Sequence, residues 1–215
     1  MEKLLKKEIK LTAPPLTFIF IAFVILSFIP NYPILVSVFF VTYGLFHSYQ
    51  TARESNDILF SILLPIKKKS IVRAKYLFAI IIEMSAFVLL IIFTLIRMFL
   101  MGNLPVYMQN VMMNANLSFL GYTLIVFGIF NFIFIGGFFK TAQKIGMPFL
   151  RYGIVLFFVI TLAEVLHNIP GLGGLNSAGF DCLQLIVLFA GIITFILLTW
   201  ISERKSEKVF EKLDL

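Results

Sequence analysis

Long apolar runs alternate with short polar segments along the whole chain. A membrane-spanning helix needs about 20 mostly apolar residues, with a range of about 17–25. Six runs meet or approach this length, and we predict a spanning helix for each: Pro14–Ile29, Pro33–Tyr49, Tyr76–Met101, Asn116–Phe139, Tyr152–Asn168 and Asp181–Ile201. Pro30 and Pro33 flank a tight turn, because proline cannot continue either helix, so the first two spans should form a hairpin. The predicted fold is all-α, a single polytopic transmembrane domain over residues 1–215.

The basic side chains predict the orientation of these spans. Of the 18 Lys and Arg residues, only Arg97 lies outside four segments: the N-terminus before residue 14, the loop 50–75, the loop 140–151 and the C-terminus after residue 201. All four segments fall on the same side of six spans. The positive-inside rule places that side, and with it both termini, in the cytoplasm.

Composition excludes a soluble protein. The chain is 60% hydrophobic and 13% charged, and its mean hydropathy is +0.99, whereas a soluble domain carries about 25% charged residues. The net charge of +7 follows from the oriented loops, so we do not expect nucleic-acid binding. A lone cysteine, Cys182, excludes an internal disulfide.

The N-terminal segment has two interpretations. Leu4, Leu5, Ile9 and Leu11 alternate with lysines at near-helical spacing. This pattern is typical of a short amphipathic helix in the headgroup layer of the membrane. A frayed tail with anchoring lysines is the alternative.

Several catalytic motifs are missing from the sequence. No glycine is followed by lysine, so the chain has no phosphate-binding loop of an ATPase. A serine nucleophile elbow and a zinc-binding H-E-x-x-H motif are also absent. We therefore expect neither a metal site nor an enzyme. Glu164 and His167, three residues apart, are the nearest approach to a catalytic pair.

The loop 51–75 is the most informative segment of the chain. It reads TARESNDILFSILLPIKKKSIVRAK. Asn56 and Asp57 can cap a short apolar helix that runs to Leu64, and Pro65 ends it. A basic cluster at headgroup level follows, where anionic lipid attracts it: Lys67, Lys68 and Lys69. Ser70 can then cap the next span. The short helix either lies in the lipid interface or binds a protein.

This loop resembles the cytoplasmic loop of type-2 ABC exporter membrane subunits, in particular the small six-span permeases of bacteria. The matching positions are Glu54, Asn56, Asp57, Leu63, Leu64, Pro65, Ile66, Lys68, Lys69, Ile71, Val72, Lys75 and Tyr76. The resemblance extends to chain length, the six spans and the basic N-terminus, and it departs at Lys67 and Ser70. It implies a coupling helix that docks on a separate ATPase chain. The residues expected to couple are Glu54, Asn56, Asp57, Ile58, Phe60, Ser61 and Pro65.

The resemblance implies an ATP-driven exporter in the bacterial cytoplasmic membrane. This chain would bind no cofactor, since ATP and Mg belong to the partner ATPase. Its partners would be that ATPase, a second permease subunit, identical or related, and membrane lipids. The cargo would be a peptide, an antibiotic or a lipid-like molecule.

Two alternatives remain open at this stage. One is the six-span substrate-binding subunit of a vitamin importer, although the first span lacks the Ala-x-x-x-Ala pattern of those subunits. The other is an intramembrane peptidase that uses Glu164 and His167.

Polar residues inside the predicted spans are the last set of candidates: His47, Glu83, Arg97, Asn131 and Glu164. Such residues are costly in a bilayer and usually face protein or water. They either line a polar path or serve the structure alone. Arg97 and Glu164 lie at similar depths, and we expect them to pair. Gly121 and Gly128 are seven residues apart and predict a smooth strip for close helix packing.

Overall fold

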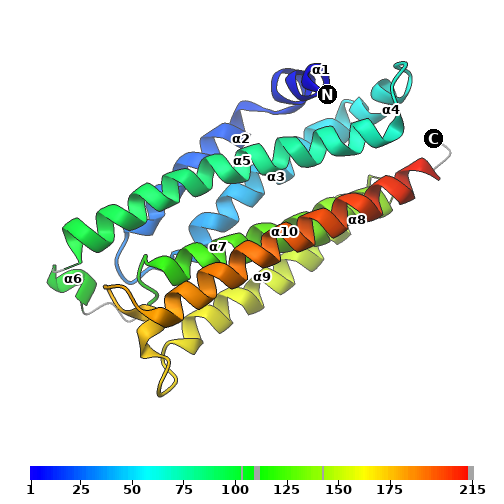
Figure 1. Ribbon diagram of the computed structural model, residues 1–215. Helices are drawn as coiled ribbons and strands as arrows, with labels where there is room; N and C mark the ends of the chain where they lie inside the picture. Colours follow the sequence, from blue (N-terminus) through cyan, green and yellow to red (C-terminus); the bar gives the residue numbers. More distant parts are fainter. Residues whose placement is uncertain (103, 109–111, 142, 213–215) are drawn as a thin grey trace.

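The computed structural model describes residues 1–102, 104–108, 112–141 and 143–212 (Figure 1). Every regular element in these ranges is helical, which confirms the all-α prediction. The N-terminal half contains α1 (Glu2–Lys7), η1 (Glu8–Thr12), α2 (Pro15–Ile19), η2 (Phe20–Phe28), α3 (Leu35–Glu54), α4 (Asp57–Ile62), α5 (Lys68–Ile96), η3 (Arg97–Met101) and α6 (Pro105–Met108). The C-terminal half contains α7 (Leu117–Ile129), η4 (Phe130–Ile135), α8 (Gly136–Lys140), α9 (Gly146–Leu166), η5 (Gly173–Asn176) and α10 (Cys182–Glu211).

The N-terminal segment is helical and bends sharply before it enters the bundle. The helix Glu2–Thr12 and the helix Pro15–Phe28 meet at 95°. Pro14 is extended and Pro15 occupies the first turn of α2, where a missing N–H costs no helical hydrogen bond. Leu5 packs against the core while Leu11 is exposed. The amphipathic-helix interpretation is thus the one that the structure supports.

Four described helices are long and apolar enough to cross a membrane: Lys68–Met101, Leu117–Lys140, Gly146–Leu166 and Cys182–Glu211. The bent pair that begins at Glu2 is a fifth candidate. The prediction of six spans is therefore not confirmed. The helix α3 is 20 residues long, but its C-terminal half carries His47, Ser48, Gln50 and Arg53, so it is too polar to qualify.

The glycine strip packs as predicted. A Cβ on Gly121 would lie 2.5 Å from the carbonyl oxygen of Val187, and one on Gly128 would lie 3.0 Å from Cα of Phe195. Gly191 of α10 faces Gly121 across this contact. The backbones of α7 and α10 can approach this closely only because no side chain separates them. The span Leu117–Lys140, which begins with α7, is the most buried of the four candidate spans.

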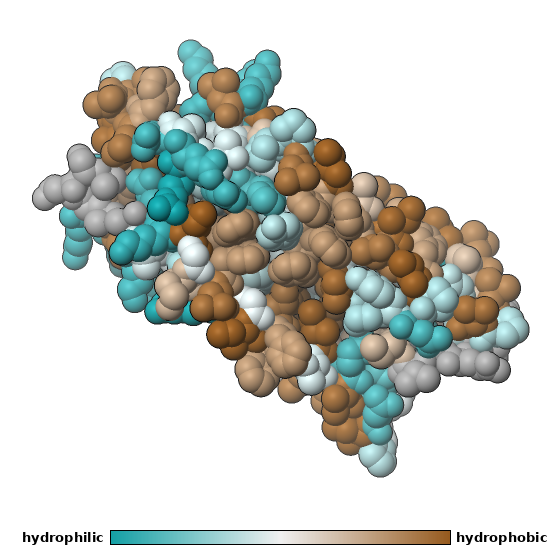
Figure 2. All heavy atoms as spheres, turned by 180° about the vertical axis from the view of Figure 1, so that it is seen from behind, coloured by the Kyte–Doolittle hydropathy of each residue, from teal (hydrophilic) through white to brown (hydrophobic). Residues whose placement is uncertain are grey.

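Both termini and α4 lie at one end of the bundle, and α6 lies at the other (Figure 1). Figure 2 shows a band of hydrophobic side chains between two hydrophilic ends. Large apolar side chains on α9 and α10, among them Phe157, Phe158 and Phe189, are more than half exposed. A surface this apolar is suited to lipid or to another membrane subunit.

Candidate coupling site

The helix α4 is held between α3 and α5 at the end of the molecule that carries both termini (Figure 1). Asn56 precedes it in the left-handed conformation (φ 52°), and its side chain makes no capping hydrogen bond. The prediction of a side-chain cap at Asn56 is thus wrong. Asn56 contributes the left-handed backbone turn before the helix, but its side chain accepts no hydrogen bond from the first turn of α4. The helix ends at Ile62, two residues before Leu64. Ser70 does not cap α5, which begins at Lys68.

The two faces of α4 differ in chemistry. Asp57, Ile58 and Ser61 are buried against the bundle. Phe60 and Leu63 face outward and are 57% and 85% exposed. The charged and hydroxyl groups of α4 therefore face the interior of the protein. The surface that α4 exposes is apolar.

Asp57 belongs to a closed ring of four charges, which we call the ion ring: Lys7, Glu8, Asp57 and Lys75. The Lys75 ammonium lies 2.8 Å from Glu8 and 3.1 Å from Asp57. The Lys7 ammonium lies 2.9 Å from Glu8 and 2.7 Å from Asp57. Each of the four carboxylate oxygens takes one contact, and the ring carries no net charge. Lys7 also donates to the hydroxyl of Ser61 at 2.8 Å.

The ring joins three segments that are far apart in the sequence. Lys7 and Glu8 come from the N-terminal helix, Asp57 from α4 and Lys75 from α5. All four side chains are close to buried, with side-chain exposures of 11%, 2%, 9% and 3% in sequence order. Buried charges of this kind are tolerated only when each is fully paired. The N-terminal helix, α4 and the start of α5 are therefore tied into one unit.

The electrostatics of the ring favour its charged form. Burial acts to raise the pKa of Asp57, but Lys75 and Lys7 outweigh it and hold the pKa below its usual range. Burial likewise acts to lower the pKa of Lys7, and Glu8 and Asp57 reverse the effect, so this pKa is raised.

A groove lies beside the outer face of α4. It has a volume of about 540 Å³ and runs between the N-terminal helix and the segment 60–70. Phe60, Leu64 and Ile66 line it together with Lys3 and Lys67. Apolar walls with a basic rim suit a partner segment that combines apolar and acidic side chains.

A family profile described as "ABC-2 family transporter protein" matches residues 3–211. The chain belongs to the ABC-2 transporter family. Searches of curated proteins and of solved structures found no match. An ABC-2 permease is a multi-pass membrane component of a transporter and not its ATPase, and permeases of this family work with an ATPase partner. The family thus favours the transporter over the vitamin-binding subunit and the peptidase.

The remaining predicted coupling residues of this ABC-2 permease lie around α4. Glu54, Asn56 and Pro65 are exposed, and Glu54 accepts a hydrogen bond from Gln50 at 2.9 Å. In the basic cluster, Lys67 and Lys69 are exposed and Lys68 is half-buried. Lys69 forms a 3.3 Å salt bridge with Glu211 at the end of α10.

The sequence pattern did not reveal the ion ring. Asp57 was expected to cap α4 and to couple to the ATPase, and in the structure its carboxylate binds Lys7 and Lys75 inside the protein. Two features of the sequence belong to the ring. Glu8 lies among the lysines of the N-terminal segment, and Lys75 is the last basic residue before the apolar run of α5.

Two of the predicted intramembrane residues lie together. Asn131 donates to Glu83 at 2.9 Å and to Thr199 at 3.0 Å. Both Glu83 and Asn131 are fully buried, and each keeps one oxygen atom without a partner among the described residues. His47 is apart from them and stacks on the ring of Phe20.

The predicted pair between Arg97 and Glu164 is wrong. The guanidinium of Arg97 donates to the carbonyl of Ser27 and lies over the ring of Tyr107, 4.4 Å from its centroid. Glu164 instead accepts a hydrogen bond from the backbone N–H of Met113 at 2.8 Å. Each side chain thus bonds a backbone group of another segment, and one carboxylate oxygen of Glu164 keeps no partner among the described residues.

Metal binding has no support in the described ranges. Within them, no group of three or more His, Cys, Asp or Glu side chains is placed to hold a metal ion.

Proposed function

We propose that this chain is the permease subunit of an ATP-driven bacterial exporter and that α4 is its coupling helix. The observation that supports this most is the division of α4 into a locked inner face and an apolar outer face. Asp57 and Ser61 are held by the N-terminal helix and α5, whereas Phe60 is exposed. A large exposed aromatic side chain on a firmly held element is a typical anchor for a protein partner.

The ion ring gives this coupling helix a mechanical role. A rotation or shift of α4 moves Asp57, and Asp57 is bonded to Lys75 in α5 and to Lys7 in the N-terminal helix. The ATPase would therefore move these three segments together. Movement at the membrane surface then reaches the spans through α5 directly.

In the proposed topology the chain crosses the cytoplasmic membrane six times, with both termini in the cytoplasm. The two spans beyond the four clear candidates are the bent helix that ends at Phe28 and α3. Cys182 is exposed at the start of α10 and would lie outside the cell. A membrane-impermeant maleimide should label it in intact cells. If labelling requires permeabilised cells, Cys182 lies in the cytoplasm and the proposed topology is wrong.

Two permease subunits, identical or related, would form the export path above two ATPase chains. The exposed apolar faces of α9 and α10 supply surface for such an assembly. The cargo would be a peptide, an antibiotic or a lipid-like molecule, as the family resemblance implies. ATP and Mg would be bound by the partner alone.

Phe60→Ala tests the proposed role of α4. The tagged chain is co-expressed with a candidate ABC ATPase from the same genome, and the retained ATPase is quantified after purification. Phe99→Ala is the matched control, because it removes an exposed phenylalanine from η3, outside α4 and outside the faces of α9 and α10. We expect Phe60→Ala alone to lose the ATPase or its stimulation, while the permease stays folded. If Phe60→Ala retains the ATPase and stimulates its activity as the unchanged chain does, α4 is not the coupling helix.

A further inference from the structure

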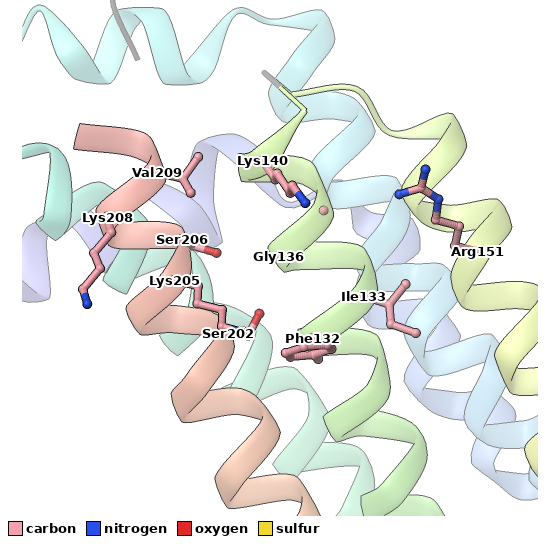
Figure 3. A pocket seen from close by; sticks show the side chains of 11 residues that line it. Phe132, Ile133, Gly136, Lys140, Arg151, Ser202, Lys205, Ser206, Lys208 and Val209 are labelled. Atoms are coloured by element: carbon pink, nitrogen blue, oxygen red, sulfur yellow. The ribbon is translucent and has the colours of Figure 1, made fainter. Parts of the chain in front are cut away.

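A second cavity lies at the same end of the molecule as α4, between η4, α8, α9 and α10 (Figure 3). Its volume is about 510 Å³. Four basic residues line it: Lys140 from α8, Arg151 from α9, and Lys205 and Lys208 from α10. Figure 3 shows Lys140 and Arg151 on neighbouring helices beside the cavity.

The charge of this cavity is not balanced within the described part of the chain. The acidic residues at the end of α10 turn toward α5, where Glu207 contacts Arg73 at 2.5 Å and Glu211 contacts Lys69 at 3.3 Å. Glu203 also lies toward Arg73, at 3.9 Å. None of the four cavity cations forms a salt bridge with a described carboxylate.

Part of the cavity wall is apolar. Phe132, Ile133 and Val209 line it, and the ammonium of Lys205 lies 5.4 Å from the centroid of the Phe132 ring. Two serine hydroxyls also face the space, but Ser202 donates to the carbonyl of Asn131 and Ser206 is bonded to Tyr76. The free polar groups of the cavity are thus its cations.

The cavity lies where α10 passes from its apolar stretch to its charged end. Leu197 and Trp200 are exposed just before it, and Lys205 and Lys208 follow. This is the depth at which a phospholipid changes from acyl chain to headgroup. A ligand that fits has a negative headgroup against the cations and an apolar chain along Phe132 and the α10 surface.

We propose that this cavity binds an anionic phospholipid from the leaflet on the side of the termini. The phosphodiester lies among Lys140, Arg151 and Lys205, and an acyl chain lies over Phe132. The site is separate from the ion ring and does not depend on α4 being the coupling helix.

Native mass spectrometry of the purified full chain tests the assignment with phosphatidylglycerol, phosphatidylcholine and glycerol 1-phosphate as probes. We expect phosphatidylglycerol to bind more tightly than phosphatidylcholine. The double variant Lys140→Gln, Lys205→Gln should weaken phosphatidylglycerol binding about tenfold or more, because each cation near an anionic lipid contributes to its attraction. The matched control is Lys10→Gln, Lys144→Gln, which removes the same charge from exposed positions that line neither this cavity nor the groove beside α4.

Four outcomes would overturn the assignment. Equal binding of phosphatidylglycerol and phosphatidylcholine would show that the negative charge of the lipid does not contribute to binding. Equal losses of binding in the cavity variant and the control variant would show that lipid is attracted by the basic end of the molecule as a whole. Full competition by glycerol 1-phosphate would indicate a site for a free anion. Binding to the monomer that disappears in a dimer would show that a second copy covers the cavity.

Discussion

Two clusters of charged side chains lie at the same end of this permease, and they differ in how their charges are paired. In the ion ring, Lys7 and Lys75 alternate with Glu8 and Asp57, and every charge has two partners. The cavity beside α10 is lined by four cations, and none of them forms a salt bridge with a described carboxylate. The first region uses charge to hold distant segments of the chain together. The second leaves charge available for a ligand. The positive-inside pattern of the sequence does not distinguish the two.

Breaking the ring should give the largest loss of stability. Lys75→Met removes one cation and leaves Glu8 and Asp57 buried without it, which costs about 3–5 kcal/mol. Lys69→Met is the matched control, because its salt bridge with Glu211 is about half exposed and worth at most about 1 kcal/mol. The free energy of unfolding is measured in detergent.

A second variant separates charge from packing in the ring. Lys75→Met combined with Asp57→Asn leaves Lys7 and Glu8 as a balanced pair. We expect this double variant to recover much of the stability lost in Lys75→Met. Strictly additive losses would mean that Lys75 and Asp57 do not interact.

Acid should weaken the same region to a smaller extent. The pKa of Asp57 is lowered in the folded chain, so its charge stabilises the fold above the unfolded pKa. This contribution is lost as pH falls through the folded value, below about pH 4. Thermal melting from pH 7 to pH 3 should therefore show an acid-dependent loss that Asp57→Asn lacks. An identical pH profile in the variant would place the acid-sensitive group elsewhere.

Glu83 should tolerate loss of its charge, in contrast with Asp57. Its carboxyl accepts from Asn131 and has no cation within salt-bridge distance among the described residues. Glu83→Gln keeps an acceptor of the same shape and should change the free energy of unfolding by less than about 1 kcal/mol, whereas Asn131→Leu leaves a buried acceptor unpaired and should cost about 1–3 kcal/mol. A large loss in Glu83→Gln would show that this carboxyl acts as a charge.

The sequence predicted the parts of the fold that depend on local pattern. Apolar runs gave the long helices from α5 onward, and the seven-residue spacing of Gly121 and Gly128 gave the close contact of α7 with α10. The position of α4 also followed from the turn residues around Asn56 and Pro65.

Contacts between distant segments were not accessible in the same way. The partners of Lys75 are 67 and 18 residues away, and no spacing rule connects them. Arg97 and Glu164 were paired by depth alone, whereas in the structure Arg97 donates to the carbonyl of Ser27 and Glu164 accepts from the N–H of Met113. Depth in the membrane predicts which residues need a partner but not which partner they find.

Photo-crosslinking from α4 is the most direct test of the account. Phe60 and Phe157 are replaced one at a time by p-benzoylphenylalanine, and each variant is irradiated in membranes that contain the co-expressed ATPase. The account predicts a covalent permease–ATPase adduct from position 60 and none from position 157. No adduct from position 60, or equal adducts from both positions, would contradict the claim that α4 is the coupling helix.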